Sequence, residues 1–213
     1  MNVIEALENR HSCRDFADRE IPRALLEKVV AGALRTPSWQ NSQPWDVYVA
    51  GYRASKRIIA AVNGMDAKGH AGLELGVPGQ WPEAIQARTR KFMSDVQHCC
   101  ENQDGKQFAR LNQELFHAPA MIIVAMDESL GVWSVFDIGA FCQSVMLAAQ
   151  EYGLQTVPAV SYVHHPDVIR RELAVPSDQK IIFGIGIGYE NPANPVNWFR
   201  SERKGLDEVV FRD

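Results

Sequence analysis

Apolar residues recur along this chain at two different spacings, which together predict a mixture of helices and strands. Over residues 25–34 and 135–149 they recur three or four positions apart, the spacing of a helix that buries one face. Short and nearly continuous apolar runs predict buried strands over residues 46–50, 121–126 and 180–189. Other patterns predict helices over 3–9, 53–62, 166–173 and, with a break near 102–105, over 82–116, and an extended segment over 154–162.

Prolines and glycines mark where several of these elements end. Pro37 ends the helix that carries residues 25–34, and Gly153 suits the end of the long apolar helix. Five glycines fall within residues 64–81, which predicts a long loop of the kind that often covers an active site. The chain after Pro195 is expected to form an extended arm.

The order of these elements bears on the fold class. Helices and strands are mixed without the strict strand–helix–strand alternation of a doubly wound parallel sheet. The 213 residues are enough for one sizeable core, and no repeat or low-complexity segment divides the chain. We therefore expect a single α+β domain over residues 1–213.

Composition narrows the classes of function. The formal net charge is −4, so no overall basic character indicates a nucleic-acid partner. The four cysteines show neither C-x-x-C nor zinc spacing, which is typical of reduced thiols. The first residues lack the apolar core of a signal peptide, and the longest apolar runs fall short of a membrane span. We expect a cytoplasmic protein that contacts neither nucleic acid nor a membrane.

The first candidate site is a basic turn near the N-terminus. Arg10, His11, Ser12 and Arg14 directly follow the predicted end of the first helix. Arginine presents a rigid fork of N–H donors that matches the oxygens of a phosphate group. The turn therefore suits a phosphorylated or anionic ligand, and a solvated basic turn is the alternative. Arg200 and Arg203 on the predicted arm are candidates for ligand binding only in combination with this turn.

The second candidate site is the polar loop 37–45, which includes Pro37, Ser38, Trp39 and Asn41 and ends on a second tryptophan. Amide and hydroxyl groups can bond the edge of a heteroaromatic ring while an indole stacks on its face. A rigid surface turn that the tryptophans anchor to the core is the alternative.

Other chemistry-bearing features are less specific. Glycines occupy every second position of residues 184–188, so one strand face is open either to a flat ligand or to a packed structural element. The vicinal pair His164 and His165 has no carboxylate or cysteine at metal-ligand spacing. No P-loop, H-E-x-x-H or G-x-S-x-G motif is present. We therefore assign no catalytic side chain and no metal site.

Taken in order, these segments resemble the nitroreductase family of flavoproteins. An R-x-S-x-R turn at 10–14 precedes P-S-x-x-N-x-Q-P-W at 37–45, and L-A-A-x-x-x-G-L at 147–154 precedes S-x-R at 201–203. Each motif alone is weak, but their combination along nearly the whole chain is specific. The C-terminal segment is most similar to the branch that includes nitrobenzoate reductases. Trp39 departs from the small residue that is common at its position.

The resemblance implies a three-layer sandwich, in which helices flank a mostly antiparallel sheet, and a homodimer that exchanges C-terminal arms. It implies one FMN per subunit at the dimer interface and ping-pong turnover between NAD(P)H and a small aromatic acceptor. Carried over by position, the cofactor-binding residues are Arg10, His11, Ser12, Arg14, Arg200 and Arg203, then Val160 and Ser161, and, from the other subunit, Pro37, Ser38, Trp39 and Asn41.

The resemblance also gives some of these residues separate roles. Arg10, Ser12 and Arg203 would hold the phosphate and ribityl chain, and His11 would contribute through its backbone or its ring. Arg14 would lie by the pyrimidine end of the flavin, where a cation favours the reduced form. Val160 and Ser161 would direct backbone N–H groups toward the flavin N5 region.

The reaction itself stays open at this point. Reduction of nitroaromatic or quinone-like acceptors is the first hypothesis. Reductive dehalogenation, enone reduction and flavin fragmentation are alternatives on the same scaffold. A third hypothesis is a flavin-binding protein without turnover, which would need the same phosphate-binding residues.

Overall fold

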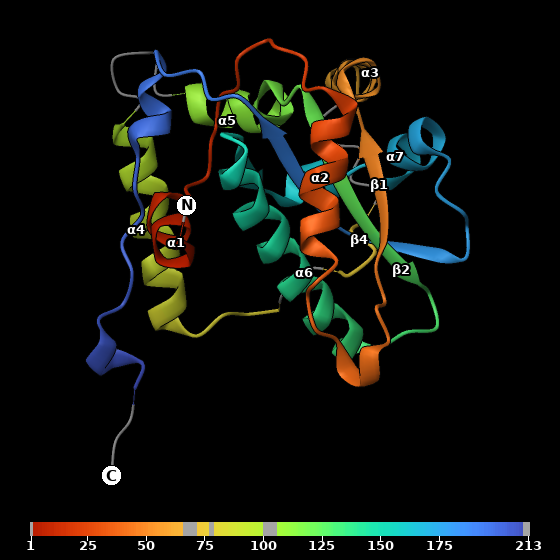
Figure 1. The fold of residues 1–213 in the computed structure, drawn as a ribbon. Helices are drawn as coiled ribbons and strands as arrows, with labels where there is room; N and C mark the ends of the chain where they lie inside the picture. The colour runs from red at the N-terminus through yellow and green to blue at the C-terminus, as the bar shows by residue number, and fades with distance from the viewer. Residues whose placement is uncertain (1, 66–71, 77–78, 100–105, 211–213) are drawn as a thin grey trace.

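The computed structural model describes residues 2–65, 72–76, 79–99 and 106–210 (Figure 1). The predicted break near residues 102–105 lies outside this part of the chain, as does much of the predicted loop 64–81.

Four strands form the central sheet, in the order β1-β2-β4-β3, and every neighbouring pair is antiparallel. Their bounds are Asp46–Ala50 for β1, Ala120–Asp127 for β2, Gln155–Pro158 for β3 and Gln179–Gly188 for β4. The three apolar runs in the sequence are β1, β2 and β4. Because β2 and β4 occupy the middle of the sheet and are covered on both faces, their sequences lack the alternation of a half-exposed strand.

Helices cover both faces of this sheet, which confirms the α+β sandwich. Alternate residues of β2 enter two separate cores, with Ile122 and Val124 on one side and Met121 and Ile123 on the other. The first core is covered by α2 (Arg23–Ala33) and α6 (Val132–Glu151), and the second by α3 (Tyr52–Asn63), α4 (Glu83–His98), α5 (Gln107–Gln113) and α7 (Pro166–Leu173).

Short helices connect these layers and begin the chain. Helix α1 (Val3–Asn9) starts with a capping box, in which Asn2 and Glu5 each accept the backbone N–H of the other. Its apolar residues Val3, Ile4 and Leu7 are exposed in this structure. The 3-10 helices are η1 (Trp39–Asn41), η2 (Leu115–His117), η3 (Val160–Val163), η4 (Pro195–Trp198) and η5 (Leu206–Glu208).

The predicted extended segment 154–162 is only partly correct. Strand β3 ends at Pro158, and the chain then turns into η3. After η4 the arm follows the outside of α4 and then projects from the body of the molecule (Figure 1). The arm was expected from the sequence, and its exchange between subunits stays a prediction.

Helix α6 corrects the expectation that all apolar runs fall short of a membrane span. It is the one helix in the described residues that is long and apolar enough to cross a membrane by length and composition. However, Ile138, Phe141, Val145 and Ala149 are buried in the core on the sheet. Its apolar composition is therefore explained by burial inside the protein.

The glycines of β4 make room for a tyrosine. A Cβ atom at Gly184 or Gly186 would overlap Tyr162 of η3, and one at Gly188 would overlap Pro119 and Phe16. Tyr162 is buried, and its hydroxyl donates a hydrogen bond to the carbonyl of Leu115 at 3.1 Å. Of the two alternatives that the sequence left open, internal packing explains these glycines.

Replacing Gly186 with alanine is expected to lower the free energy of unfolding by about 1–3 kcal/mol, because the new methyl group must displace the Tyr162 ring. Urea denaturation measures this change. Gly72→Ala is the matched control, since nothing lies within 4 Å of a Cβ at Gly72, and its effect should stay within about 0.5 kcal/mol. Equal stabilities of the two variants would contradict the packing role.

Candidate functional site

A cleft forms where the N-terminal turn meets the C-terminal arm. Six of its lining residues are ones that the sequence assigned to a single ligand, namely Arg10, His11, Ser12, Arg14, Arg200 and Arg203. The fold thus brings together two basic segments from opposite ends of the chain. We call this feature the cationic cleft.

The charge of the cationic cleft is poorly compensated. Glu8 is its one carboxylate among the described lining residues, against four guanidinium groups. Burial and then the charge of Arg203 lower the pKa of Arg10, which stays protonated at physiological pH. Within the described part of the chain, nothing accepts a hydrogen bond from the Arg10 guanidinium. A bound anion would supply both the acceptor and the countercharge.

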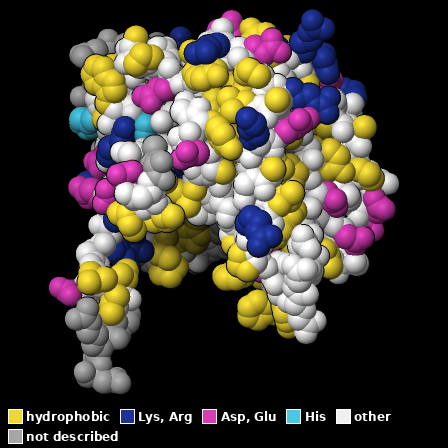
Figure 2. All heavy atoms as spheres, viewed as in Figure 1, with side chains coloured by type: hydrophobic (Ala, Val, Ile, Leu, Met, Phe, Trp, Pro, Cys, Tyr) yellow, Lys and Arg dark blue, Asp and Glu magenta, His cyan; other side chains and the backbone are white. Residues whose placement is uncertain are grey.

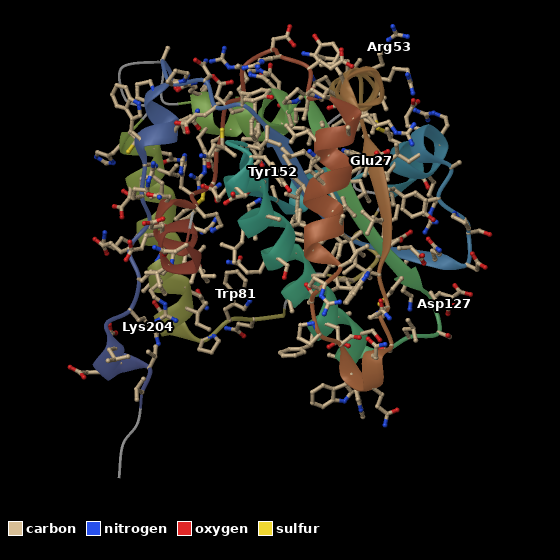
Figure 3. The ribbon with its side chains drawn as sticks, in the orientation of Figure 1. Glu27, Arg53, Trp81, Asp127, Tyr152 and Lys204 are labelled. Carbon is tan, nitrogen blue, oxygen red and sulfur yellow. The ribbon has the colours of Figure 1, made fainter. Side chains whose placement is uncertain are left out.

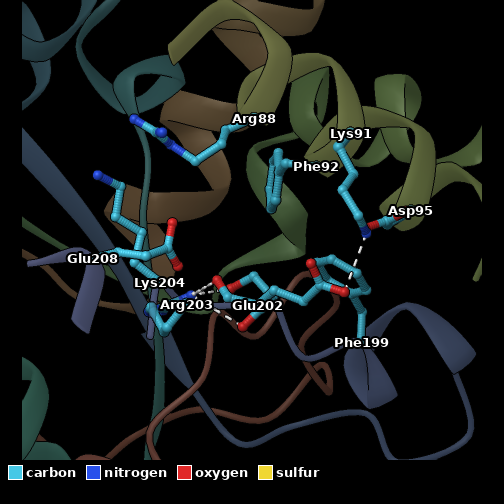
Figure 4. A pocket seen from close by; sticks show the side chains of 10 residues that line it. Arg88, Lys91, Phe92, Asp95, Phe199, Glu202, Arg203, Lys204 and Glu208 are labelled. Atoms are coloured by element: carbon cyan, nitrogen blue, oxygen red, sulfur yellow. Dashed lines mark hydrogen bonds and ion pairs between the residues drawn. The ribbon is translucent and has the colours of Figure 1, made fainter. Parts of the chain in front are cut away.

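Within the described residues, the arm arginines bond only to uncharged groups. Arg203 donates to the Ser201 carbonyl at 3.0 Å and to the Ser201 hydroxyl at 2.6 Å, and folds back along the arm (Figure 4). Arg200 donates to the carbonyls of Asn197 at 2.7 Å and Phe199 at 3.0 Å. These bonds orient the two guanidinium groups without neutralising them.

The N-terminal turn is fixed against the edge strand β3. Ser12 pairs with Thr156 in a parallel bridge. The His11 ring is buried, with Nδ1 3.1 Å from the carbonyl oxygen of Asn9 and Nε2 3.2 Å from the Glu190 carboxylate. The Asn9 contact holds the ring, while Nε2 has no hydrogen-bond partner among the described residues.

Arg14 lies inside an aromatic cage at the wall of the cationic cleft. Its guanidinium carbon is 5.6 Å from the ring centre of Phe92, 6.0 Å from that of Phe108 and 5.4 Å from that of Phe199. It also donates to the carbonyl of Ser12 at 3.1 Å. Cation–π contacts with α4, α5 and the arm therefore hold this charge in place. Sequence reasoning missed these contacts, because Phe92 and Phe108 belong to no motif and Phe199 was noted only as the start of the C-terminal segment 199–203.

The predicted loop residues lie elsewhere in the protomer. Pro37, Ser38 and Trp39 line a second hollow beside the start of α6, which shares no lining residue with the cationic cleft. Asn41 follows in η1 with a φ of +59°, in the left-handed region. A single protomer therefore does not join these four residues to the arginines.

The second hollow has an exposed apolar surface. Trp39 is 56% exposed, Val132 76%, Trp133 62% and Phe136 71%. Hydrophobic side chains gather at the lower end of the molecule in Figure 2, where η1 and the start of α6 lie. We call these four residues the apolar patch. Contiguous exposed apolar surface of this kind usually marks a binding surface.

The two tryptophans of the loop behave differently. Trp45 is buried and stacks on Phe141 at 4.8 Å, as the rigid-turn alternative expects. Trp39 instead stays exposed, with its ring 5.5 Å from that of Trp133 and its backbone N–H donating to the Asp137 carboxylate at 3.0 Å. The loop is thus anchored at one end and presents an indole at the other.

Val160 and Ser161 begin η3, directly after β3. Ser161 is buried, and its hydroxyl has no hydrogen-bond partner among the described residues. A buried unpaired hydroxyl is unfavourable, so a bound group with a polar edge would stabilise this position.

A polar network behind the N-terminal turn was missed by the sequence analysis. Asp15 contacts His117, Asn191, Asn194 and Asn197. The spacing of the three asparagines, every third position, is the only trace of this network in the sequence.

Comparisons with known proteins agree with this geometry. The model of the nitroreductase family matches residues 7–189. A 4-nitrobenzoate reductase of Nocardioides sp. (strain LMS-CY) is 28% identical, over 98% of this chain and 90% of its own length. A chloronitrobenzene nitroreductase of Comamonas testosteroni is 29% identical, over 98% of this chain and 95% of its own length.

A solved structure with a similar fold is the FMN and NADPH-dependent nitroreductase NfnB from Sphigopyxis sp. strain HMH. Its TM-score is 0.88 at 29% identity, and the match covers 100% of this chain and 99% of that one. The FMN-dependent NfnB from Mycobacterium smegmatis, solved with NADPH, matches with a TM-score of 0.88 over the full length of both chains, but its 24% identity supports the fold alone.

Proposed function

This chain belongs to the nitroreductase family, and we propose that it reduces nitroaromatic or quinone-like acceptors by a ping-pong mechanism. It is an FMN-dependent oxidoreductase that uses NAD(P)H. The observation that carries the proposal is the cationic cleft, in which basic segments from both ends of the chain converge and Glu8 is the one carboxylate among the described lining residues.

The residues of the cationic cleft fit the phosphate of FMN. Arg10 lacks an acceptor within the described residues, and Arg200 and Arg203 bond only to uncharged groups. We propose that these three arginines and Ser12 bind the phosphate and ribityl end, with the backbone of His11 beside them. Ser161, whose hydroxyl is unpaired, and Val160 would meet a polar edge of the ring system.

We propose that the working enzyme is a homodimer with its site at the interface. One protomer separates Pro37, Ser38, Trp39 and Asn41 from the cationic cleft, so a second copy is needed to complete the set. The apolar patch, the exposed face of α1 and the projecting arm are all surfaces that a second copy would cover.

In this proposal the protein positions the reactants, and we assign no side chain as a proton donor. FMN, when bound, supplies the electron transfer between NAD(P)H and the acceptor. The fixed charge of Arg14 beside the cleft favours negative charge on a bound ring.

Two further properties are part of the proposal. We propose that residues 1–213 form one domain, since both cores lie against the two faces of one sheet. We also propose a cytoplasmic location, because Cys13, Cys99 and Cys142 are free thiols, as is usual in a reducing compartment.

Anaerobic reduction tests the proposed function. The purified protein should be yellow, and NADH or NADPH should bleach it within seconds. Addition of 4-nitrobenzoate or a quinone should then restore the colour. Bound flavin that NAD(P)H never reduces would favour the non-catalytic alternative. A reduced enzyme that neither acceptor reoxidises would favour dehalogenation or another flavin reaction.

A further inference from the structure

The carboxylate of Asp15 lies at the centre of a buried hydrogen-bond network. Its Oδ1 is 2.7 Å from Nδ1 of His117, and its Oδ2 accepts the side-chain amides of Asn191 at 2.8 Å and Asn194 at 3.0 Å. The Asp15 backbone N–H donates to Oδ1 of Asn197 at 3.2 Å. The turn that carries Ser12 and Arg14 is thereby tied to the segment that leads into the C-terminal arm.

Asn197 joins the two basic segments directly. Its side-chain oxygen accepts the backbone N–H of Arg14 at 2.7 Å, and its side-chain amide donates to the carbonyl of Asp15 at 2.8 Å. Its own carbonyl accepts the guanidinium of Arg200 at 2.7 Å. Since Asn197 is completely buried, it sets the spacing between the N-terminal and C-terminal arginines of the cationic cleft.

His117 lies between two carboxylates. Nδ1 is 2.7 Å from Asp15, and Nε2 is 2.7 Å from Oε2 of Glu114. A neutral imidazole has one N–H and cannot donate to both. Both contacts are favourable only in the imidazolium, so this geometry requires a charged His117.

The backbone at His117 supports the same interpretation. Leu115, Phe116 and His117 have φ values of +49°, +57° and +58°, a left-handed turn that side chains disfavour. The turn directs the His117 ring at Asp15, and the carbonyl of Phe116 accepts the N–H of Phe16 at 3.2 Å. A strained backbone conformation that surrounding contacts maintain is often found at a functional site.

We propose that Asp15, His117 and Asn197 are positioning residues for the phosphate-binding arginines, and that the charge on His117 keeps the two basic segments at binding distance. The inference rests on the proposed function, because it assigns these residues to the FMN phosphate. None of the three lines the cationic cleft. They act through Arg200 and through the turn that carries Arg10 and Ser12, which Asn197 holds at the backbone N–H of Arg14. We call them the clasp.

The charged groups around His117 determine the pH dependence. The hydrogen bond to Asp15 raises the pKa of His117, burial lowers it, the bond to Glu114 raises it, and the net pKa lies above its ordinary value. Asp18, which pairs with Lys56 of α3, is a further carboxylate whose pKa the His117 charge lowers. The stabilisation from His117 is therefore present at low pH and is lost as pH rises through this raised pKa.

The carboxyl of Asp15 sets the acidic limit of the pH range over which the clasp holds. Burial raises its pKa, but the hydrogen bonds from His117, Asn194 and Asn191 lower it further than burial raises it. Its contribution is thus lost only as pH falls through this lowered pKa. The clasp is expected to hold between these two pKa values and to loosen as pH rises through that of His117.

Flavin affinity tests the clasp independently of turnover. The full chain, stripped of flavin, is titrated with FMN and with riboflavin, and flavin fluorescence reports both dissociation constants. Riboflavin lacks the phosphate, so the ratio of the two constants isolates the phosphate contacts. The FMN phosphate has its second pKa near about 6, so measurements between about pH 7 and 9.5 avoid its titration.

His117→Gln retains an amide donor but cannot carry charge. It is expected to lower the preference for FMN over riboflavin about tenfold at pH 7, because the uncharged amide loses the charge-assisted hydrogen bonds to Asp15 and Glu114. In the wild type the preference should fall as pH rises, and in His117→Gln it should be independent of pH. Tyr48→Phe is the control, because it loses one hydrogen bond, to Gln179 at 2.6 Å, far from the clasp, and should keep the wild-type profile.

Each outcome supports or overturns the positioning role of the clasp. An unchanged preference and pH profile in His117→Gln would overturn the clasp. If that variant does not fold, a wild-type preference that stays flat from about pH 7 to 9.5 would overturn it equally. A wild type that never binds FMN would overturn the proposed function itself, whereas firm FMN binding with a pH-independent preference would overturn the clasp alone.

Discussion

Arg203→Ala is expected to weaken FMN binding by about ten- to a hundredfold, because a charge-assisted hydrogen bond to phosphate contributes about 1.5–3 kcal/mol. Arg203 lines the cationic cleft, and its guanidinium bonds to uncharged groups of Ser201 and Glu202. Fluorescence titration of the flavin-free protein with FMN measures the loss. Riboflavin binding should change little, since the missing contact is to the phosphate.

Lys204→Ala is the matched control for this variant. It removes the same charge at the next position of the arm, and Lys204 lies away from the sheet (Figure 3) and lines a neighbouring pocket instead of the cationic cleft (Figure 4). Arg203→Lys should be intermediate, because lysine keeps the charge and loses the guanidinium fork. An FMN affinity of Arg203→Ala equal to that of the parent would rule out the phosphate role.

Phe136→Glu is expected to convert the dimer to a monomer at micromolar concentration and to abolish stable FMN binding. Phe136 is 71% exposed in the protomer and belongs to the apolar patch. In a dimer that covers this patch, an unpaired carboxylate would lose its hydration at a cost of several kcal/mol. Sedimentation velocity reports the assembly state, and absorbance of the sedimenting species reports the bound flavin.

Val49→Glu controls for the added charge, since Val49 is also exposed but lies on the edge strand β1, outside the apolar patch. It should remain dimeric and keep FMN. A Phe136→Glu variant that stays dimeric would place the interface elsewhere. A wild-type monomer that holds FMN would contradict the shared site.

The strands show how local pattern and tertiary environment combine. Each of β1, β2 and β4 begins and ends within one residue of its apolar run. For β2 and β4 the reason is that a strand covered on both faces needs apolar side chains at every position. Helix α6 was also found from its apolar spacing. The exposure of Trp133 and Phe136 at its start was not predicted, because both lie off the stripe that carries Ile138 and Phe141.

In the candidate site, sequence pattern explains less and tertiary contacts explain more. Motifs identified the arginines at both ends of the chain, because guanidinium chemistry is visible in residue type. They did not identify the cage around Arg14, since ordinary phenylalanines on two helices and the arm form it. They also left the glycines of β4 undecided, because the same spacing permits a ligand or a tyrosine ring.

The sequence by itself determined the bounds of β1, β2 and β4, the fold class and the basic segments that point to a phosphate, because each depends on neighbouring residues and on their chemistry. Only the tertiary structure decided which residues meet. The contact of Asn197 with Arg14 and Arg200, and the position of His117 between Asp15 and Glu114, join segments that are far apart in the chain. Such contacts leave no periodic trace, because the packing of the whole fold sets their distances.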